Sequence, residues 1–377
     1  MESIAVIVES SAKGILGVRS MDPQYVDGTI VAENIVTVGA SVGERWESSL
    51  VFDEGRGHQR KRTVRLMRRC DATPDAAFVR SLGEDFWVDP DLLWDVQVLL
   101  RAGRFVILRG LSGTGKTTLA KRLADAMRMT SIEVDVGMVE EAKQFFGEES
   151  AQHGTTAFRR SALTQFLLAA AAAPPQDPRA GATHLVRLDE VNRVHPKIFA
   201  AAWNGLFDDD REVTVTTSEG SVSIVMPPHV GGIATMNPND PRFGGTYALD
   251  AATMNRAAVF DVGFPPKEFE VELLQRQVQQ RYHQSIARND AIHIVNAAAA
   301  LRTASERRTI PLAPSPRNTL DCALCVARGR PVKIAIERIL LQVYEDHPDD
   351  PESARKQAGE IVRSQDVSLS PRAKRRP

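Results

Sequence analysis

The sequence is poor in cysteine, nearly neutral in charge and without a long hydrophobic run. Its 3 cysteines among 377 residues are too few for a disulfide framework and favour a reducing compartment. Since 47 basic and 48 acidic residues give a formal net charge of -1, no overall field marks the chain as a nucleic-acid binder. No stretch approaches the ~20 apolar residues of a membrane-spanning helix, and the opening MESIAVIVESS lacks the basic segment of a secretion signal. We expect a cytoplasmic protein with no membrane segment.

Several kinds of site are missing as well. The 8 histidines are scattered, and no grouping of serine or cysteine with histidine predicts a nucleophilic triad. Cys322 and Cys325 form a C-x-x-C without a second pair, which favours helix packing over a zinc site. No internal repeat of solenoid period is present. A length of 377 residues with 43% hydrophobic residues predicts two or three globular domains instead.

The character of the sequence changes three times along the chain. Short β-branched runs separated by Gly, Asp and Ser predict a β-rich barrel or sandwich over 1–87. Apolar runs alternate with helical segments over 88–264, which predicts an α/β domain with a parallel sheet. A mostly helical segment follows over 265–345, after a break at Pro265 and Pro266. Residues 346–377 are polar with a basic end, and we expect them to be a disordered tail.

The β-rich segment carries a basic cluster, formed by Arg56, Arg60, Lys61, Arg62, Arg65, Arg68 and Arg69. Such a cluster is usually a solvated face, and it can also contact nucleic acid. Little aromatic surface on which bases could stack accompanies it. Nothing else in 1–87 indicates a role for this segment.

A glycine-rich motif, GLSGTGKTT at 110–118, lies between an expected strand at 105–108 and a helical segment at 119–127. It matches the phosphate-binding pattern G-x-x-x-x-G-K-[ST]. Its glycines let backbone N–H groups turn toward an anion, at the positive end of the following helix. Lys116 can reach the β- and γ-phosphates of a nucleotide, and the hydroxyl of Thr117 can ligate Mg²⁺. The expected phosphate-binding residues are Gly110, Ser112, Gly113, Thr114, Gly115, Lys116, Thr117 and Thr118.

Further strands are expected at 132–136, 184–188, 231–235 and 258–262, and polar residues follow two of them. Asp189 and Glu190 end the strand in HLVRLDEVNRV and would face the phosphate loop at the carboxyl edge of a parallel sheet. Asp189 can hold the Mg²⁺ shell, and Glu190 can polarise an attacking water. Asn237, at the end of the strand in GGIATMNPND, can orient that water or contact the γ-phosphate. The alternative for the two acids is a surface pair that begins a loop.

Two arginines complete the expected catalytic set of Glu190, Asn237, Arg256 and Arg317. Arg256 precedes the last strand, and it either faces solvent or reaches the γ-phosphate of a neighbouring subunit as an arginine finger. Arg317, in PLAPSPRNTL, begins a helix of the C-terminal segment and can close that segment over the nucleotide as a lid.

These motifs, in this order, resemble the AAA+ ATPases of the branch that contains MoxR-type chaperone ATPases, the McrB motor and dynein-like modules. The similar segments span about residues 88–345, and they are DEVNRVHPKIF, REVTVTTSEGSVSIVMPP, IATMNPND, GGTYALDAATMNRA and SPRNTL. The resemblance implies a five-stranded parallel P-loop sheet with helices on both faces, a helical lid, and ATP with Mg²⁺. It also implies a homo-hexameric ring. Ala257 and Ala258 depart from the family, which usually has an aromatic residue after the finger arginine.

The motifs leave several functions open for such a module. The resemblance implies a MoxR-like chaperone ATPase that remodels a partner protein, with a von Willebrand A domain protein as the expected partner class. The alternative is a McrB-like nucleic-acid-directed motor coupled to a nuclease, in which the basic cluster binds DNA and GTP can replace ATP. A nucleotide-gated switch with little turnover is a third reading, against which Glu190 and Arg256 argue. Phe145 and Phe146 lie in the segment where AAA+ proteins have a pore loop. The alternative is that both side chains belong to the hydrophobic core.

Overall fold

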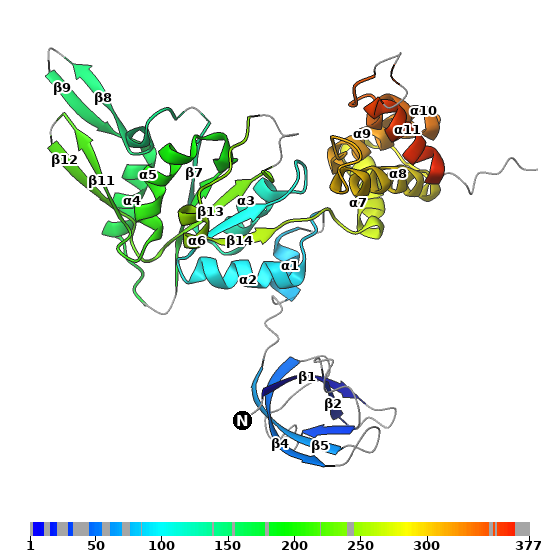
Figure 1. The fold of residues 1–377 in the computed structure, drawn as a ribbon, viewed down its shortest axis with the longest axis horizontal. Coiled ribbons are helices and arrows are strands. Elements are labelled where there is room, and N and C mark those ends of the chain that lie inside the picture. Colours follow the sequence, from blue (N-terminus) through cyan, green and yellow to red (C-terminus); the bar gives the residue numbers. More distant parts are fainter. Residues whose placement is uncertain are drawn as a thin grey trace, which may run out of the picture. The chain divides into compact units, whose positions relative to one another are not determined.

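The computed structural model divides the chain into two compact units, Met1–Asp75 and Ala76–Pro377 (Figure 1). It describes residues 3–10, 16–20, 29–32, 45–54, 61–69, 76–83, 85–137, 139–152, 155–177, 181–218, 220–239, 245–346, 350 and 353–365. The boundary lies earlier than the expected one after residue 87. Leu82 and Val88 are buried in the same cluster as Leu93, and this packing assigns the segment after Asp75 to the second unit.

The first unit is a five-stranded sheet, which agrees with the β-rich expectation. Its strands are β1 (Ser3–Ser10), β2 (Leu16–Ser20), β3 (Thr29–Ala32), β4 (Arg45–Glu54) and β5 (Lys61–Arg69). They pair in the order β2-β1-β4-β5-β3, antiparallel except for the parallel pair β3 and β5. The edge strands β2 and β3 also approach each other, so the sheet is a nearly closed barrel. A further β-branched run of the sequence, at 34–38, lies outside the described residues.

The register of β4 and β5 places acids opposite several residues of the basic cluster. Lys61 lies opposite Glu54, Arg62 opposite Asp53, and Arg68 opposite Glu47. Opposite charges at facing positions of neighbouring strands stabilise the pairing. The register thus sets basic positions of β5 opposite acidic positions of β4. Arg56 and Arg60 lie outside the described residues.

The α/β part of the second unit is built on a five-stranded parallel sheet in the order β14-β6-β13-β10-β7. The strands are β6 (Phe105–Arg109), β7 (Thr130–Val134), β10 (His184–Leu188), β13 (Val230–Met236) and β14 (Ala258–Asp261). All five coincide with apolar runs of the sequence to within two residues at either end. Every residue of β13 is buried, as expected for the central strand of a sheet covered on both faces.

Helices cover both faces of this sheet because successive strand residues point to opposite sides. Val106 and Leu108 pack with α2 (Pro90–Arg101) and α3 (Lys116–Ala126). Phe105 and Ile107 pack with α4 (Ala162–Ala172) and α5 (Pro196–Phe207). The short helices α1 (Ala76–Ser81) and α6 (Ala251–Arg256) precede α2 and β14 (Figure 1). This is the P-loop α/β architecture predicted from the motifs.

Two β-hairpins project together from one end of the α/β part (Figure 1). The hairpin of β11 (Glu212–Thr217) and β12 (Gly220–Val225) is formed by REVTVTTSEGSVSIVMPP, one of the segments that resemble the family. The hairpin of β8 (Gly147–Gln152) and β9 (Thr155–Arg160) was not expected, because its strands are polar and lack clear alternation. The Glu149 carboxylate joins the two hairpins by accepting hydrogen bonds from Ser218, at 2.7 Å from its N–H and 2.6 Å from its hydroxyl.

Phe145 and Phe146 are core residues. They are 2% and 1% exposed, and both rings contact Trp203 of α5. Side chains buried in this way cannot line a pore, so the alternative of a pore loop at these two positions is wrong.

The lid is a helical bundle with its own hydrophobic core. Its elements are α7 (Lys267–Tyr282), α8 (Arg288–Glu306), α9 (Pro316–Ala327), α10 (Val332–Ala335), a π-helical turn at Ile336–Leu340, and α11 (Ala354–Gln365). Cys322 is buried in this core, in agreement with a packing role for that cysteine.

The disordered tail predicted from residue 346 onward is wrong for α11. Ala358 and Val362 are buried in the lid core, and the helix packs against α8. The charged composition of this stretch concealed an apolar face at helical spacing, and that face is what folds it. Residues 366–377 lie outside the described residues.

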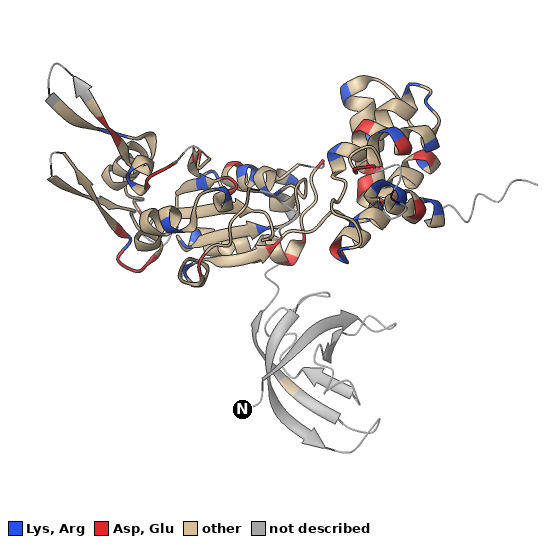
Figure 2. Ribbon diagram, turned by 45° about the horizontal axis from the view of Figure 1, so that its top comes forward, with Lys and Arg blue, Asp and Glu red and all other residues tan. Residues whose placement is uncertain are grey.

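Charged side chains of both signs are interleaved over the second unit (Figure 2). Among the described residues, no helix is long and apolar enough to cross a membrane.

Candidate active site

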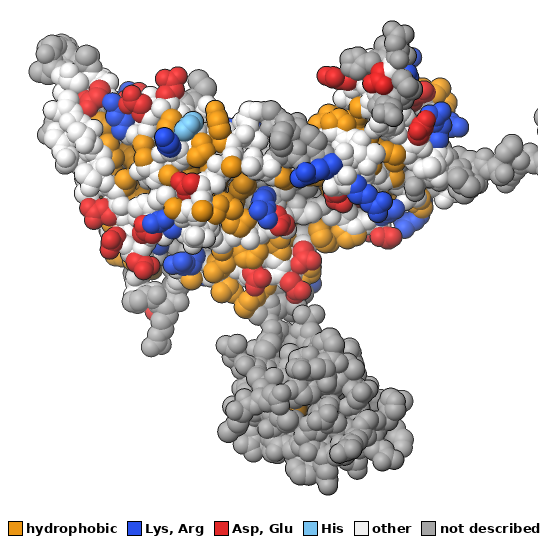
Figure 3. Space-filling view, in the orientation of Figure 1, with side chains coloured by type: hydrophobic (Ala, Val, Ile, Leu, Met, Phe, Trp, Pro, Cys, Tyr) orange, Lys and Arg blue, Asp and Glu red, His pale blue; other side chains and the backbone are white. Residues whose placement is uncertain are grey.

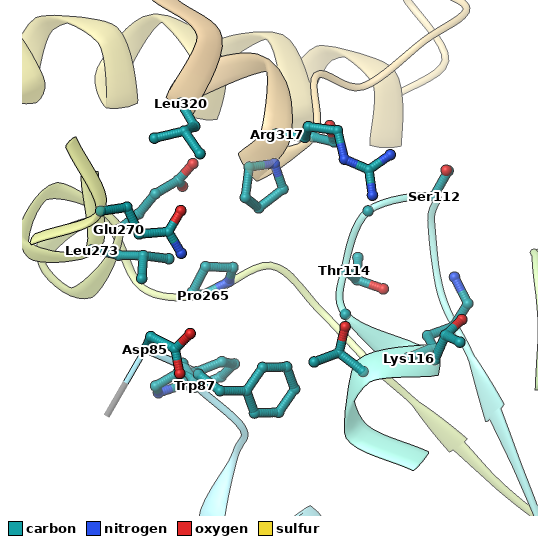
Figure 4. Close-up of a pocket in the computed structure, with 18 of the residues that line it drawn as sticks. Asp85, Trp87, Ser112, Thr114, Lys116, Pro265, Glu270, Leu273, Arg317 and Leu320 are labelled. Carbon is teal, nitrogen blue, oxygen red and sulfur yellow. The ribbon is translucent and has the colours of Figure 1, made fainter. Parts of the chain in front are cut away.

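A cleft of about 730 Å³ lies between the phosphate loop and the lid (Figure 4). The loop and the start of α3 contribute Ser112, Gly113, Thr114, Gly115, Lys116, Thr117 and Thr118. The sheet edge contributes Glu190 and Asn237, and the lid contributes Arg317. The fold thus brings nearly all of the residues predicted from separate motifs into one cleft.

The glycines of the loop are required by backbone conformation and by close neighbours. Gly113 has φ +82°, and a Cβ there would lie 2.3 Å from the Cβ of Ser315 in the lid. Gly115 has φ +89°, and a Cβ there would lie 2.9 Å from the ring of Phe86. Any other residue would be strained and would clash. Helix α3 begins immediately after this turn, so its positive end faces the cleft.

Lys116 is buried, and its ammonium group lies at the sheet edge. Its Nζ donates hydrogen bonds to Gly110 O and Leu111 O at 2.9 Å, and to Asn237 Oδ1 at 3.2 Å. Burial lowers the pKa of Lys116 to about 8, although Glu190 and Asp189 act in the opposite direction. A buried cation with this pKa is stabilised by an anion, and a phosphate group is the ligand that the loop around it fits.

Asp189 and Thr117 form an oxygen-rich pair at the mouth of the loop. Asp189 Oδ1 accepts hydrogen bonds from the hydroxyl of Thr117 at 2.8 Å and from that of Thr235 at 2.5 Å. A hydroxyl and a carboxylate beside a phosphate site are the hard oxygen donors that Mg²⁺ prefers. The residues therefore fit this ion, with Thr117 and Asp189 as its protein ligands. Thr235 was missed from the sequence, where it stands inside a buried strand.

Glu190 has a backbone conformation that is rare for residues other than glycine, with φ 51° and ψ 48°. Its N–H donates to the Thr235 hydroxyl at 2.9 Å. Its carboxylate lies 2.5 Å from Arg193 Nε and 3.5 Å from Asn237 Nδ2. Left-handed backbone at such a residue is typical of functional sites, where the surrounding structure maintains the strain.

Asn237 connects the lysine with the acid. Its side-chain oxygen accepts from Lys116, and its side-chain nitrogen donates to Glu190. Asn192 holds it there, because the fully buried Asn192 side chain bonds both the N–H and the carbonyl of Asn237, at 3.3 and 3.0 Å. The positioning by Asn192 was not predicted, although Asn192 belongs to the DEVNR segment.

Arg317 enters the cleft from the first turn of α9. In Figure 4 its guanidinium is directed toward the phosphate loop near Ser112. A capping box of Ser315 and Asn318 fixes this end of the helix. The start of α9 is thus a second helix end at the cleft, opposite the start of α3.

Of the four predicted catalytic residues, Arg256 is the one that does not line the cleft. It ends α6, where its Nε lies 2.6 Å from Asp208 Oδ1 and its Nη1 3.1 Å from Ala252 O. A role for Arg256 in its own cleft is therefore unsupported, and a role on a neighbouring subunit stays a prediction.

The segment before α2 forms a wall of the cleft that sequence reasoning missed. Asp85, Phe86 and Trp87 line it. Asp85 accepts two hydrogen bonds from Arg122, at 2.7 and 3.1 Å, which hold the pKa of that carboxyl below its usual range. The guanidinium of Arg122 also lies 5.1 Å from the Phe86 ring centroid. No motif marks these residues, and only their place ahead of the first helix of the fold could have suggested them.

Comparison with known proteins agrees with this geometry. Residues 105–257 match the family described as "AAA domain (dynein-related subfamily)". The chain is 28% identical over 232 residues to "Putative chaperone BssE" of Thauera aromatica, which covers 61% of this chain and 72% of that protein. It is 25% identical over 259 residues to the uncharacterized protein YojN of Bacillus subtilis, covering 68% and 78% of the two chains. An uncharacterized protein of Staphylococcus epidermidis is 24% identical over 259 residues, covering 68% and 91%.

Proposed function

Because residues 105–257 form an AAA domain of the dynein-related subfamily, we propose that this protein hydrolyses ATP in an oligomeric ring and remodels a partner protein. The observation that carries the proposal is the position of Asn237 between Lys116 and Glu190. Through hydrogen bonds to both, the Asn237 amide links a phosphate-binding lysine with an acid suited to activate water. A site that only binds nucleotide has no need of the acid.

In the proposed reaction the chain's own residues have separate tasks. Lys116 and the N–H groups of the loop bind the phosphates, and Arg317 adds positive charge from the lid. Mg²⁺, held by Thr117 and Asp189, would offset the charge of the β- and γ-phosphates. Glu190 accepts a proton from the attacking water, and Asn237 orients that water. Glu190 must leave Arg193 to act on water, since the ion pair occupies its carboxylate.

The position of Arg256 supports assembly into a ring. Its guanidinium lies outside its own cleft, on α6 beside Asp208. If it acts as the finger, it acts on a neighbouring subunit, and each active site needs two chains. Hydrophobic side chains are exposed among charged ones on the face of the α/β part seen in Figure 3. Val98, Leu168 and Tyr247 are each more than two-fifths exposed, and a ring contact would cover such side chains.

A protein substrate is supported by the paired hairpins and by one relative. Hairpins β8–β9 and β11–β12 are joined through Glu149 and Ser218, and β11 follows α5, which begins just after the acidic pair. A change at Glu190 can thus reach the hairpins through one helix. The relative from Thauera aromatica carries the name of a chaperone. A MoxR-like role with a von Willebrand A domain partner is the form of the proposal to test first.

The test is mass measurement of the full chain with ATP and with ADP, followed by turnover assays with ATP and GTP. We expect an oligomer, a hexamer by resemblance, and Mg²⁺-dependent release of phosphate from ATP. A monomer with full activity would contradict the trans role of Arg256. An oligomer that binds ATP without turnover would contradict the role of Glu190.

A second candidate function is that of a nucleic-acid-directed motor of the McrB kind, and the first unit favours it. A nearly closed five-stranded barrel is also the form of many oligonucleotide- and oligosaccharide-binding domains. In the register of β4 and β5, acidic positions lie opposite Lys61, Arg62 and Arg68. DNA binding by the full chain over a salt series decides between the two functions. Steep salt dependence that is lost in Arg65→Ala/Arg69→Ala would favour the motor, and no binding would exclude it.

A further inference from the structure

The lid contains a buried ion pair close to the cleft. Glu270 of α7 is 0% exposed and Arg302 of α8 is 5% exposed. The guanidinium grips the carboxylate with two hydrogen bonds, from Nη1 at 2.6 Å and from Nη2 at 2.9 Å. A buried ion pair gains little net stability over well-packed apolar side chains, because both charges lose water. The contacts of this ion pair with neighbouring elements therefore matter more than its contribution to the stability of the lid.

Both members of the pair hold the start of α9. The hydroxyl of Thr319, in the first turns of that helix, donates to Glu270 Oε1 at 2.7 Å. The Nε–H of the same guanidinium donates to Pro314 O at 2.8 Å, just ahead of the N-cap residue Ser315. Three donors of one guanidinium and one threonine hydroxyl therefore fix α7, α8 and α9 against one another.

The same guanidinium contacts the connection between the α/β part and the lid. Arg302 Cζ lies 4.2 Å from the ring centroid of Phe264, which stands between β14 and α7. A cation over an aromatic face at this distance is attractive, and more so when it is shielded from water. The ion pair thus contacts the segment that connects the α/β part to the lid.

The end of α9 held in this way is the one that faces the phosphate loop. A Cβ on Gly113 would lie 2.3 Å from the Cβ of Ser315, so the first turn of α9 touches the phosphate loop. Arg317 follows two residues later and lines the cleft (Figure 4). A shift of α9 would therefore move Arg317 relative to the phosphate loop.

The geometry points to Glu270 and Arg302 as positioning residues that set Arg317 over the bound phosphates. The inference rests on the proposed ATP-hydrolysing function, and it adds the means by which the lid arginine is placed. Arginine is needed because its planar fork serves Glu270 and Pro314 at once. Lysine keeps the charge and lacks the fork.

The test is a double-mutant cycle of Arg302→Lys with Arg317→Ala in the full chain. We expect Arg302→Lys to lower kcat for ATP by about 10- to 100-fold, the loss that a misplaced catalytic group causes. Since Arg302 acts through Arg317, the double variant is expected to be no slower than Arg317→Ala alone. The matched control is Arg355→Lys, which alters another lid ion pair, with Asp346, outside the cleft, and should leave kcat unchanged.

Two results overturn the inference: normal turnover in Arg302→Lys, or losses that multiply in the double variant as independent defects do. If Arg302→Lys does not fold, Thr319→Val provides the same cycle with a smaller change, and Thr319→Ser should restore the wild-type rate. If the wild type does not hydrolyse ATP, the proposed function fails. The positioning role can then still be tested by measuring the ATP affinity of the same single and double variants. Non-multiplying losses of affinity then support the positioning role, and multiplying losses or unchanged affinity overturn it.

Discussion

The carboxylate of Glu190 lies 2.5 Å from the Nε of Arg193, three residues farther along the chain. The two side chains are 35% and 57% exposed. The acid best placed to activate water is thus paired with a neighbouring cation. Because the pair is open to solvent, it can be broken at small cost.

Replacing Arg193 by alanine is expected to raise the basal rate of ATP hydrolysis. An exposed pair is worth up to ~1 kcal/mol, so its loss would raise the rate by about fivefold at most. Steady-state phosphate release without any partner protein measures this. The double variant Glu190→Gln/Arg193→Ala should show no gain. A fall in rate for Arg193→Ala would instead give the arginine a direct part in catalysis.

Replacing Glu190 by glutamine is expected to lower kcat by about 10²–10⁴, the usual contribution of a general base. ATP binding should persist, since Lys116 and the loop glycines are untouched. Single-turnover hydrolysis and direct binding of ATP with Mg²⁺ separate the two effects. Glu337→Gln alters an exposed lid acid outside the cleft and serves as the control. Equal turnover in wild type and Glu190→Gln would remove the assignment of the base.

Nucleotide affinity is expected to fall as the pH rises through about 8. The pKa of Lys116 is lowered to about 8 in the empty protein, mainly by burial. A bound phosphate favours the charged ammonium and raises this pKa, so the complex holds more protons than the empty protein above pH 8. Binding then takes up a proton, and alkaline pH opposes it.

Calorimetry of ATP binding at pH 7, 8 and 9, in buffers of different ionisation enthalpy, measures that proton uptake. The variant Lys116→Met should bind weakly at every pH and without the alkaline loss. An affinity for the wild type that stays constant from pH 7 to 9 would show that the lysine remains charged when the site is empty.

The motifs predicted the edge of the sheet well because that chemistry is local in sequence. The loop at 110–118, the acids at 189–190 and Asn237 each follow their own strand, and parallel strands bring their carboxyl ends to one edge. Arg317 was predicted from its place at the start of a helix in PLAPSPRNTL, and α9 does begin there. For these residues, a correct prediction of the fold class was enough to predict that they meet in one site.

Residues that act through long-range packing left no such signal. Glu270 and Arg302 read as exposed charges of two polar helices, and only the meeting of α7, α8 and α9 buries them. Asp85 pairs with Arg122 across the start of the unit without any motif. The helix α11 was lost to the charged composition around its apolar face. In each case the contact that fixes the residue joins segments that are far apart in the sequence, and no local pattern predicts that they meet.

Arg256→Ala and Glu190→Gln are expected to be inactive singly and active together. In a head-to-tail ring, a cleft with intact Glu190 can receive Arg256 from a neighbour that carries Glu190→Gln. Random mixing of the two variants in equal amounts gives such a pair at about a quarter of the interfaces, and turnover should return to about that level. Steady-state ATP hydrolysis over a series of mixing ratios measures it, with Arg256→Ala/Glu190→Gln mixed into wild type as the control for subunit exchange. Recovery at no ratio, although the subunits exchange, would place Arg256 outside catalysis and leave it as the partner of Asp208 that ends α6.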